Sequence, residues 1–127
     1  MHLSDCFMEL FAYVVYLLRT AEAKQPPHEQ VKHHIQDLLK ESEGIMERNG
    51  LSRDDYDMAR FAVCSWIDEA ILNSSWGEKG YWLKDQLQRR HYNTTDAGEE
   101  FFERLNSLGL HQKELREVYY LCLALGF

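Results

Sequence analysis

Two adjacent carboxylates, Asp68 and Glu69, lie within a largely apolar segment, residues 61–72. Helical spacing places Asp68 on the same face as Cys64, where an ionised carboxylate is unfavourable unless it is hydrogen-bonded or paired. Glu69 lies instead on a more polar stripe with Asn73. Two interpretations stay open. Asp68 accepts hydrogen bonds from backbone amides or an arginine and ties helices together, or the acidic pair lines a cleft and contacts a partner, and both roles can coexist.

Catalysis and metal binding have little support beside this acidic pair. No second convergent acid or nucleophile accompanies the carboxylates, and Glu-x-x-His pairs, H-E-x-x-H, phosphate-binding glycine loops and G-x-S-x-G are all missing. His33 and His34 are adjacent, so they point about 100° apart on a helix. We expect them, together with His28, to be solvated surface histidines. The sequence therefore predicts a protein that is not an enzyme, with no cofactor and no bound metal.

A group of aromatic residues follows the acidic pair, at positions 76, 81, 82 and 92. Aromatic side chains of this kind more often fill a core than bind a ligand. Trp76, which precedes Gly77 in a predicted loop, is the best candidate for a clamp over the neighbouring helices. The predicted partner-binding cleft therefore comprises Asp68, Glu69, Asn73 and Trp76.

The composition excludes several classes of protein. The 127 residues include 14 Lys and Arg against 21 Asp and Glu, for a net charge of −7, which disfavours binding to a nucleic-acid backbone. Hydrophobic residues make up 45% of the chain, too many for a disordered protein. The three cysteines form no C-x-x-C motif and have apolar neighbours, which predicts buried, reduced thiols in a cytosolic protein. The longest apolar stretch, residues 7–18, is shorter than the roughly 20 residues that cross a bilayer.

Apolar residues recur at three- and four-residue spacing along most of the chain, and both prolines come before residue 28. This pattern predicts an all-α fold, with one domain or two small subdomains, 1–74 and 75–127. Ser4 is the expected first N-cap, Asn49-Gly50 a left-handed C-terminal cap, and Ser52 with Asp55 a capping box. The six expected helices cover residues 4–23, 27–48, 53–73, 79–91, 96–108 and 112–125.

Three ordered blocks resemble a known family. Residues 57–73, DMARFAVCSWIDEAILN, followed by Trp76-Gly77, resemble the "RYALCAFLDEAVLNTPWG" block of the DotU/TssL proteins. Residues 92–105 are similar to that family's "F-H-x-E…G-G-E-x-F-F…L" stretch, and residues 119–127, YYLCLALGF, to its "LYLCLSLGFEG" segment. Asp68 and Glu69 match the paired acids of the family.

The resemblance implies a hook-like domain of two small helical bundles on the cytoplasmic side of the bacterial inner membrane. Such proteins join a large IcmF/TssM-like membrane protein in type VI secretion, or its counterpart in type IVB secretion. In type VI systems they also help to recruit baseplate subunits. The sequence leaves open whether the domain forms a homodimer. Family members continue beyond the "LGF" point to one C-terminal membrane anchor. We therefore expect a soluble cytoplasmic fragment that meets the membrane only through an anchor absent from this chain.

Other functional classes stay open at this point. The main alternative is a stand-alone helical adaptor or an immunity-like protein that neutralises a basic toxin. A metalloenzyme is a third class, which stoichiometric metal in the purified protein would support. An open reading frame for about 20 apolar residues after Phe127 would favour the secretion scaffold over the adaptor.

Overall fold

The computed structural model describes all 127 residues and contains helices only. A short 3-10 helix, η1 (Leu3–Phe7), leads directly into the first α-helix. The α-helices are α1 (Met8–Thr20), α2 (His28–Arg48), α3 (Arg53–Leu72), α4 (Lys79–Leu83), α5 (Leu87–Tyr92), α6 (Ala97–Ser107) and α7 (Lys113–Ala124). The predicted all-α fold is confirmed.

Local capping signals explain the boundary between α2 and α3. Gly50 follows α2 with a φ of +64°, a left-handed conformation that favours glycine, as the Asn49-Gly50 pair predicts. The hydroxyl of Ser52 then accepts a hydrogen bond of 3.2 Å from the Asp55 amide, so Ser52 is the N-cap of α3. Two long helices can therefore fold back on each other through a connection of four residues.

The first helix begins differently from the prediction. Ser4 does not act as an N-cap, because its hydroxyl donates to Oε1 of Glu117 at 2.6 Å. The 3-10 helix instead starts after His2, whose backbone amide donates to Asp5 at 2.8 Å. The N-terminus is therefore tied to α7, a partner more than a hundred residues away that local sequence does not reveal.

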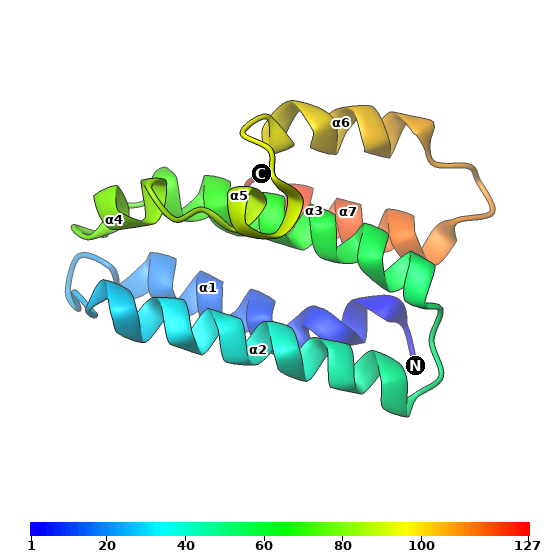
Figure 1. Cartoon of the computed structure of the whole chain (residues 1–127), viewed down its shortest axis with the longest axis horizontal. Coiled ribbons are helices and arrows are strands. Elements are labelled where there is room, and N and C mark those ends of the chain that lie inside the picture. Colours follow the sequence, from blue (N-terminus) through cyan, green and yellow to red (C-terminus); the bar gives the residue numbers. More distant parts are fainter.

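The central helix of the molecule is α3. Figure 1 shows α1 and α2 side by side on one side of it, α7 beside it and α6 on the opposite side. Helix α3 therefore buries side chains in several directions, including Tyr56, Phe61 and Trp66. The Trp66 ring packs on Phe11 at 5.1 Å, and its indole N–H donates to the Leu125 carbonyl at 3.3 Å. One tryptophan thus joins α1, α3 and the end of α7.

One hydrophobic cluster forms the core and takes residues from η1 through α7. It includes residues on both sides of position 74, and the division into subdomains 1–74 and 75–127 stays a prediction. Cys6, Cys64 and Cys122 are buried and unpaired, as their apolar neighbours predict. None of the helices combines the length and the apolar character that spanning a membrane requires.

Candidate functional site

Asp68 lies on α3 and is 1% exposed. Its Oδ1 accepts hydrogen bonds from the indole N–H of Trp82 and the amide of Leu87, each at 2.9 Å. Its Oδ2 accepts from the amide of Gln88 at 2.9 Å. The first interpretation is therefore confirmed: Asp68 ties helices together through backbone amides, and no arginine takes part.

The hydrogen bonds that Asp68 accepts explain why one predicted helix is divided into two helices in the structure. The sequence predicts a helix over residues 79–91, whereas the structure has α4 and α5 with a break between them. Leu87 and Gln88 are the first two residues of α5, and Gln86 caps that helix with no side-chain bond. Because helix N-terminal amides have no partner within the helix, a carboxylate there is stabilising. Asp68 supplies it from α3, so the single helix was a wrong prediction.

Burial and hydrogen bonding act in opposite directions on the Asp68 carboxyl. Burial raises its pKa, because removal from water disfavours the charged form. The hydrogen bonds from Gln88, Leu87 and Trp82 offset part of that effect. The side chain is thus held in one position by three donors from two other segments, and this fixes the C-terminal half of α3.

Glu69 and Asn73 lie on the exposed side of the same helix. The Asn73 side-chain amide donates to Oε1 of Glu69 at 3.0 Å, and the Asn73 backbone amide donates to the Glu69 carbonyl at 3.1 Å. The predicted polar stripe is therefore present as a hydrogen-bonded pair at the end of α3. Of the four residues predicted for the cleft, these two have side chains that a partner can reach.

Trp76 lies in the loop between α3 and α4 and is 0% exposed. Its indole N–H donates to the carbonyl of Pro26 at 2.9 Å, and the Gly77 amide donates to Oε1 of Gln25 at 2.8 Å. Trp76 therefore holds this loop against the loop between α1 and α2. Its side chain contributes to the fold from inside, and its edge is not available at the surface.

The expectation for the histidines holds for two of the three. His33 and His34 are exposed, whereas the side chain of His28 is only 13% exposed. The His28 ring lies among the rings of Trp76, Tyr81 and Trp82, with centroid distances of 5.7–6.3 Å. The prediction of a solvated His28 was wrong, because three aromatic side chains from a distant part of the chain cover it.

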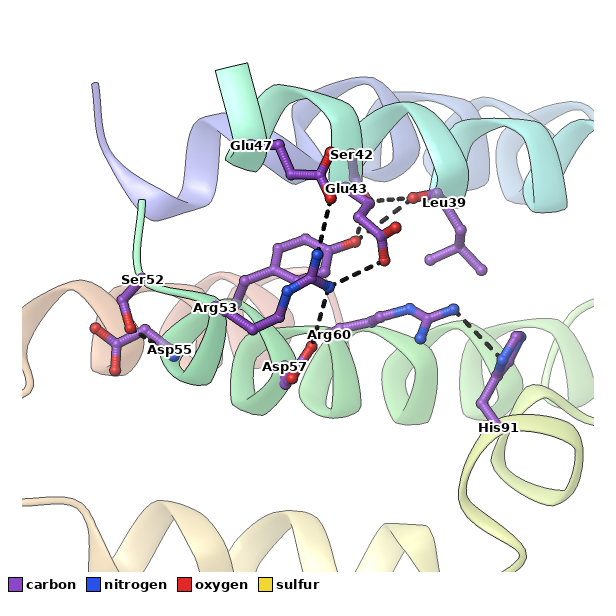
Figure 2. Close-up of polar contacts among 11 residues, drawn as sticks. Leu39, Ser42, Glu43, Glu47, Ser52, Arg53, Asp55, Asp57, Arg60 and His91 are labelled. Atoms are coloured by element: carbon purple, nitrogen blue, oxygen red, sulfur yellow. Dashed lines mark hydrogen bonds and ion pairs between the residues drawn. The ribbon is translucent and has the colours of Figure 1, made fainter. Parts of the chain in front are cut away.

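A second group of polar side chains lies between α2, α3 and α5. Nη2 of Arg60 is 3.3 Å from Nδ1 of His91, as Figure 2 shows. They border a cleft of about 250 Å³. Sequence reasoning assigned no role to this group, although Arg60 is the one basic residue of the segment 54–72. That isolated positive charge is the sequence signal that could have indicated this polar group.

Three exposed side chains, one at the N-terminus and two on α7, also approach one another. Ligand atoms of His2, Glu114 and Glu117 lie within 4.8 Å of one another. Oε2 of Glu114 accepts the Leu3 amide at 3.1 Å, and Glu117 accepts the Ser4 hydroxyl. These carboxylates therefore serve to attach η1 to α7.

The environment of His91 predicts a dependence of stability on pH. Burial lowers its pKa below the ordinary value of 6.5, and the nearby charges of Arg60 and Arg90 lower it further. As the pH falls below 6.5, the unfolded chain therefore takes up a proton at this position before the folded chain does. Stability is then lost with decreasing pH.

We expect the urea midpoint of the protein to drop between pH 7.5 and pH 5.5, and the drop to be smaller in His91→Gln. Urea titrations at both pH values compare the two proteins, and the difference between their drops isolates His91 from the other titrating groups. Equal drops in both proteins would contradict a depressed His91 pKa.

The comparisons with solved structures give the same fold. The chain is similar to the cytoplasmic domain of TssL from Acinetobacter baumannii, with 30% identity and a TM-score of 0.86, over 100% of this chain and 82% of that one. It is also similar in fold to SciP/TssL from Escherichia coli Enteroaggregative 042, with 24% identity and a TM-score of 0.75, over 98% of this chain and 73% of that one.

No curated protein matches the chain. The family whose model does match, over residues 2–127, is described as "Type VI secretion system protein DotU". This match confirms the resemblance that the three sequence blocks indicate, and it covers all the helices described above. The chain therefore belongs to the DotU family of type VI secretion system proteins.

Proposed function

We propose that this domain is a non-enzymatic scaffold of a type VI secretion membrane complex and works on the cytoplasmic side of the inner membrane. In this proposal it binds an IcmF/TssM-like membrane protein and baseplate subunits. Membership of the DotU family supports a structural role in type VI secretion. It also favours this scaffold over the stand-alone adaptor or immunity-like protein.

The observation that carries the proposal is the arrangement at the end of α3. The buried Asp68 fixes the helix from inside, while its neighbour Glu69, hydrogen-bonded to Asn73, is exposed on the outside. A rigid support beneath an exposed polar pair favours protein recognition, because little side-chain conformational freedom is lost on binding. We infer that Glu69 and Asn73 contact a secretion partner.

The buried side chains that could in principle react, a carboxylate and a thiol, support a role without catalysis. The Asp68 oxygens are occupied by Trp82 and the amides of α5. Burial raises the pKa of the Cys64 thiol to about 12, so that it stays protonated at neutral pH and is a poor nucleophile. These side chains therefore serve the packing of the domain, and recognition is left to its surface.

A charge reversal tests this proposal. We expect Glu69→Arg to reduce the capture of the IcmF/TssM-like protein or of baseplate subunits by about tenfold, because a charge reversal within an interface opposes binding. The measurement is a quantitative pull-down from the source cell, with the partners identified by mass. The far-ultraviolet circular dichroism should be unchanged, since the Glu69 side chain is exposed.

Glu103→Arg is the matched control, because Glu103 is also an exposed glutamate within a helix but lies on α6. It makes the same change in net charge and should capture the partners as the unchanged protein does. If Glu69→Arg captures them equally well, Glu69 does not belong to the interface.

A further inference from the structure

Arg60 is a partly buried cation without an acidic partner. Its side chain extends from the middle of α3 into the space beside α2 and α5, where its one hydrogen-bonding partner is His91 (Figure 2). Its Nε is buried and donates to no group, although a guanidinium carries five N–H donors. By contrast, Arg53, Arg90 and Arg104 each lie within 3.2 Å of a carboxylate oxygen.

The surroundings of Arg60 make the cleft positive within an acidic protein. Lys40 on α2 contributes a second positive charge. The one acidic side chain there, Glu43, already pairs with Arg53 at 3.2 Å. Six residues line the cleft: Gln36, Leu39, Lys40, Glu43, Arg60 and His91. The opening of about 250 Å³ is large enough for a small anionic group, and its two cations favour negative charge although the whole chain has a net charge of −7.

We propose that the cleft between α2, α3 and α5 binds a carboxylate, and that in the assembled secretion complex this is an aspartate or glutamate side chain of a protein partner. The assignment of the carboxylate to a protein partner rests on the proposed function, whereas the presence of an anion site does not. The planar fork of Arg60 matches a carboxylate with two parallel hydrogen bonds. A single negative charge also suits two cations beside Glu43 better than a phosphate group, whose charge of about −1.5 to −2 Glu43 would repel more strongly.

The first experiment measures carboxylate binding by the isolated protein. The probe is N-acetylglutamate α-amide, which carries one side-chain carboxylate, and N-acetylglutamine amide is its neutral match. Nuclear magnetic resonance follows the Nε–H signal of Arg60, which belongs to the same guanidinium as the proposed contact. We expect this signal to shift to saturation with the glutamate probe and to stay unchanged with the glutamine probe.

Variants locate the effect in the cleft. Arg60→Gln should weaken binding of the glutamate probe at least about tenfold, because a charge-assisted bidentate pair is lost. Lys40→Gln, on the exposed side of α2, should weaken it by about threefold. Arg48→Gln is the matched control, because Arg48 is an exposed arginine at the far end of α2, and it should bind the probe unchanged.

Several results would overturn the proposal. They are an Arg60 signal that does not respond, equal binding by Arg60→Gln, or saturation by inorganic phosphate but not by the glutamate probe. If Arg60→Gln fails to fold, the test rests on Lys40→Gln, and unchanged probe binding in that variant would overturn the site.

The second experiment tests whether a protein partner supplies the carboxylate that binds at Arg60. Arg60→Gln enters the same pull-down as Glu69→Arg, and we expect about a tenfold loss of at least one captured subunit. If the probe binds but Arg60→Gln captures every partner normally, the partner assignment is overturned while the proposed function stands. If instead Glu69→Arg captures normally and Arg60→Gln does not, the scaffold role is retained and its contact surface moves to the cleft.

Discussion

Replacing Trp76 with alanine is expected to lower the free energy of unfolding by about 4 kcal/mol. The indole is fully buried, so its removal leaves a large cavity between the two loops at one end of the molecule. The Pro26 carbonyl also loses the donor that lies 2.9 Å away. A shift of the urea midpoint at constant slope would measure the loss.

Trp76→Phe separates packing from hydrogen bonding at this position. Phenylalanine keeps most of the buried aromatic volume but cannot donate to Pro26, so we expect a loss of about 1–2 kcal/mol. Because the indole lies inside the protein, the same variant should capture secretion partners normally. Loss of partner capture with unchanged stability would contradict the buried role and assign Trp76 to recognition.

The long helices were predictable because their signals are local. The expected helix 27–48 is α2, His28–Arg48, and the expected helix 53–73 is α3, Arg53–Leu72. In both, apolar residues at three- and four-residue spacing define the buried face, and Gly50 and Ser52 mark the connection. The exposed pairing of Glu69 with Asn73 belongs to the same class, since residues four apart on a helix are neighbours.

Features that depend on distant segments could not be predicted in this way. The break between α4 and α5 follows from Asp68, which lies 19 residues before Leu87 in the sequence and 2.9 Å from its amide in space. His28 is largely covered because residues around position 80 pack over it. The cleft at Arg60 requires three helices at once, so its isolated charge was visible in the sequence but its surroundings were not.

Replacing Asp68 with alanine is expected to lower the free energy of unfolding by about 3 kcal/mol. Three donors lose their acceptor together: the buried Trp82 indole, the buried amide of Leu87 and the partly buried amide of Gln88. A buried polar group left without a partner is unfavourable by about 1–3 kcal/mol, and water entering the space left by the carboxylate satisfies part of this demand. Urea denaturation followed by circular dichroism measures the change, and an unchanged midpoint would contradict the buried position of Asp68.

A double-mutant cycle then assigns part of this loss to one contact. Trp82→Phe removes one donor and leaves the two α5 amides bound to Asp68, so the single change should be milder than Asp68→Ala. If the indole and the carboxylate interact as described, the two changes together should destabilise the protein less than the sum of the single changes, by about 1 kcal/mol. Strict additivity would show that Asp68 acts through the α5 amides alone.

In either case, the carboxylate that holds the start of α5 also fixes the end of α3, where Glu69 is exposed. Loss of Asp68 should therefore weaken partner capture, even though its buried side chain touches no partner.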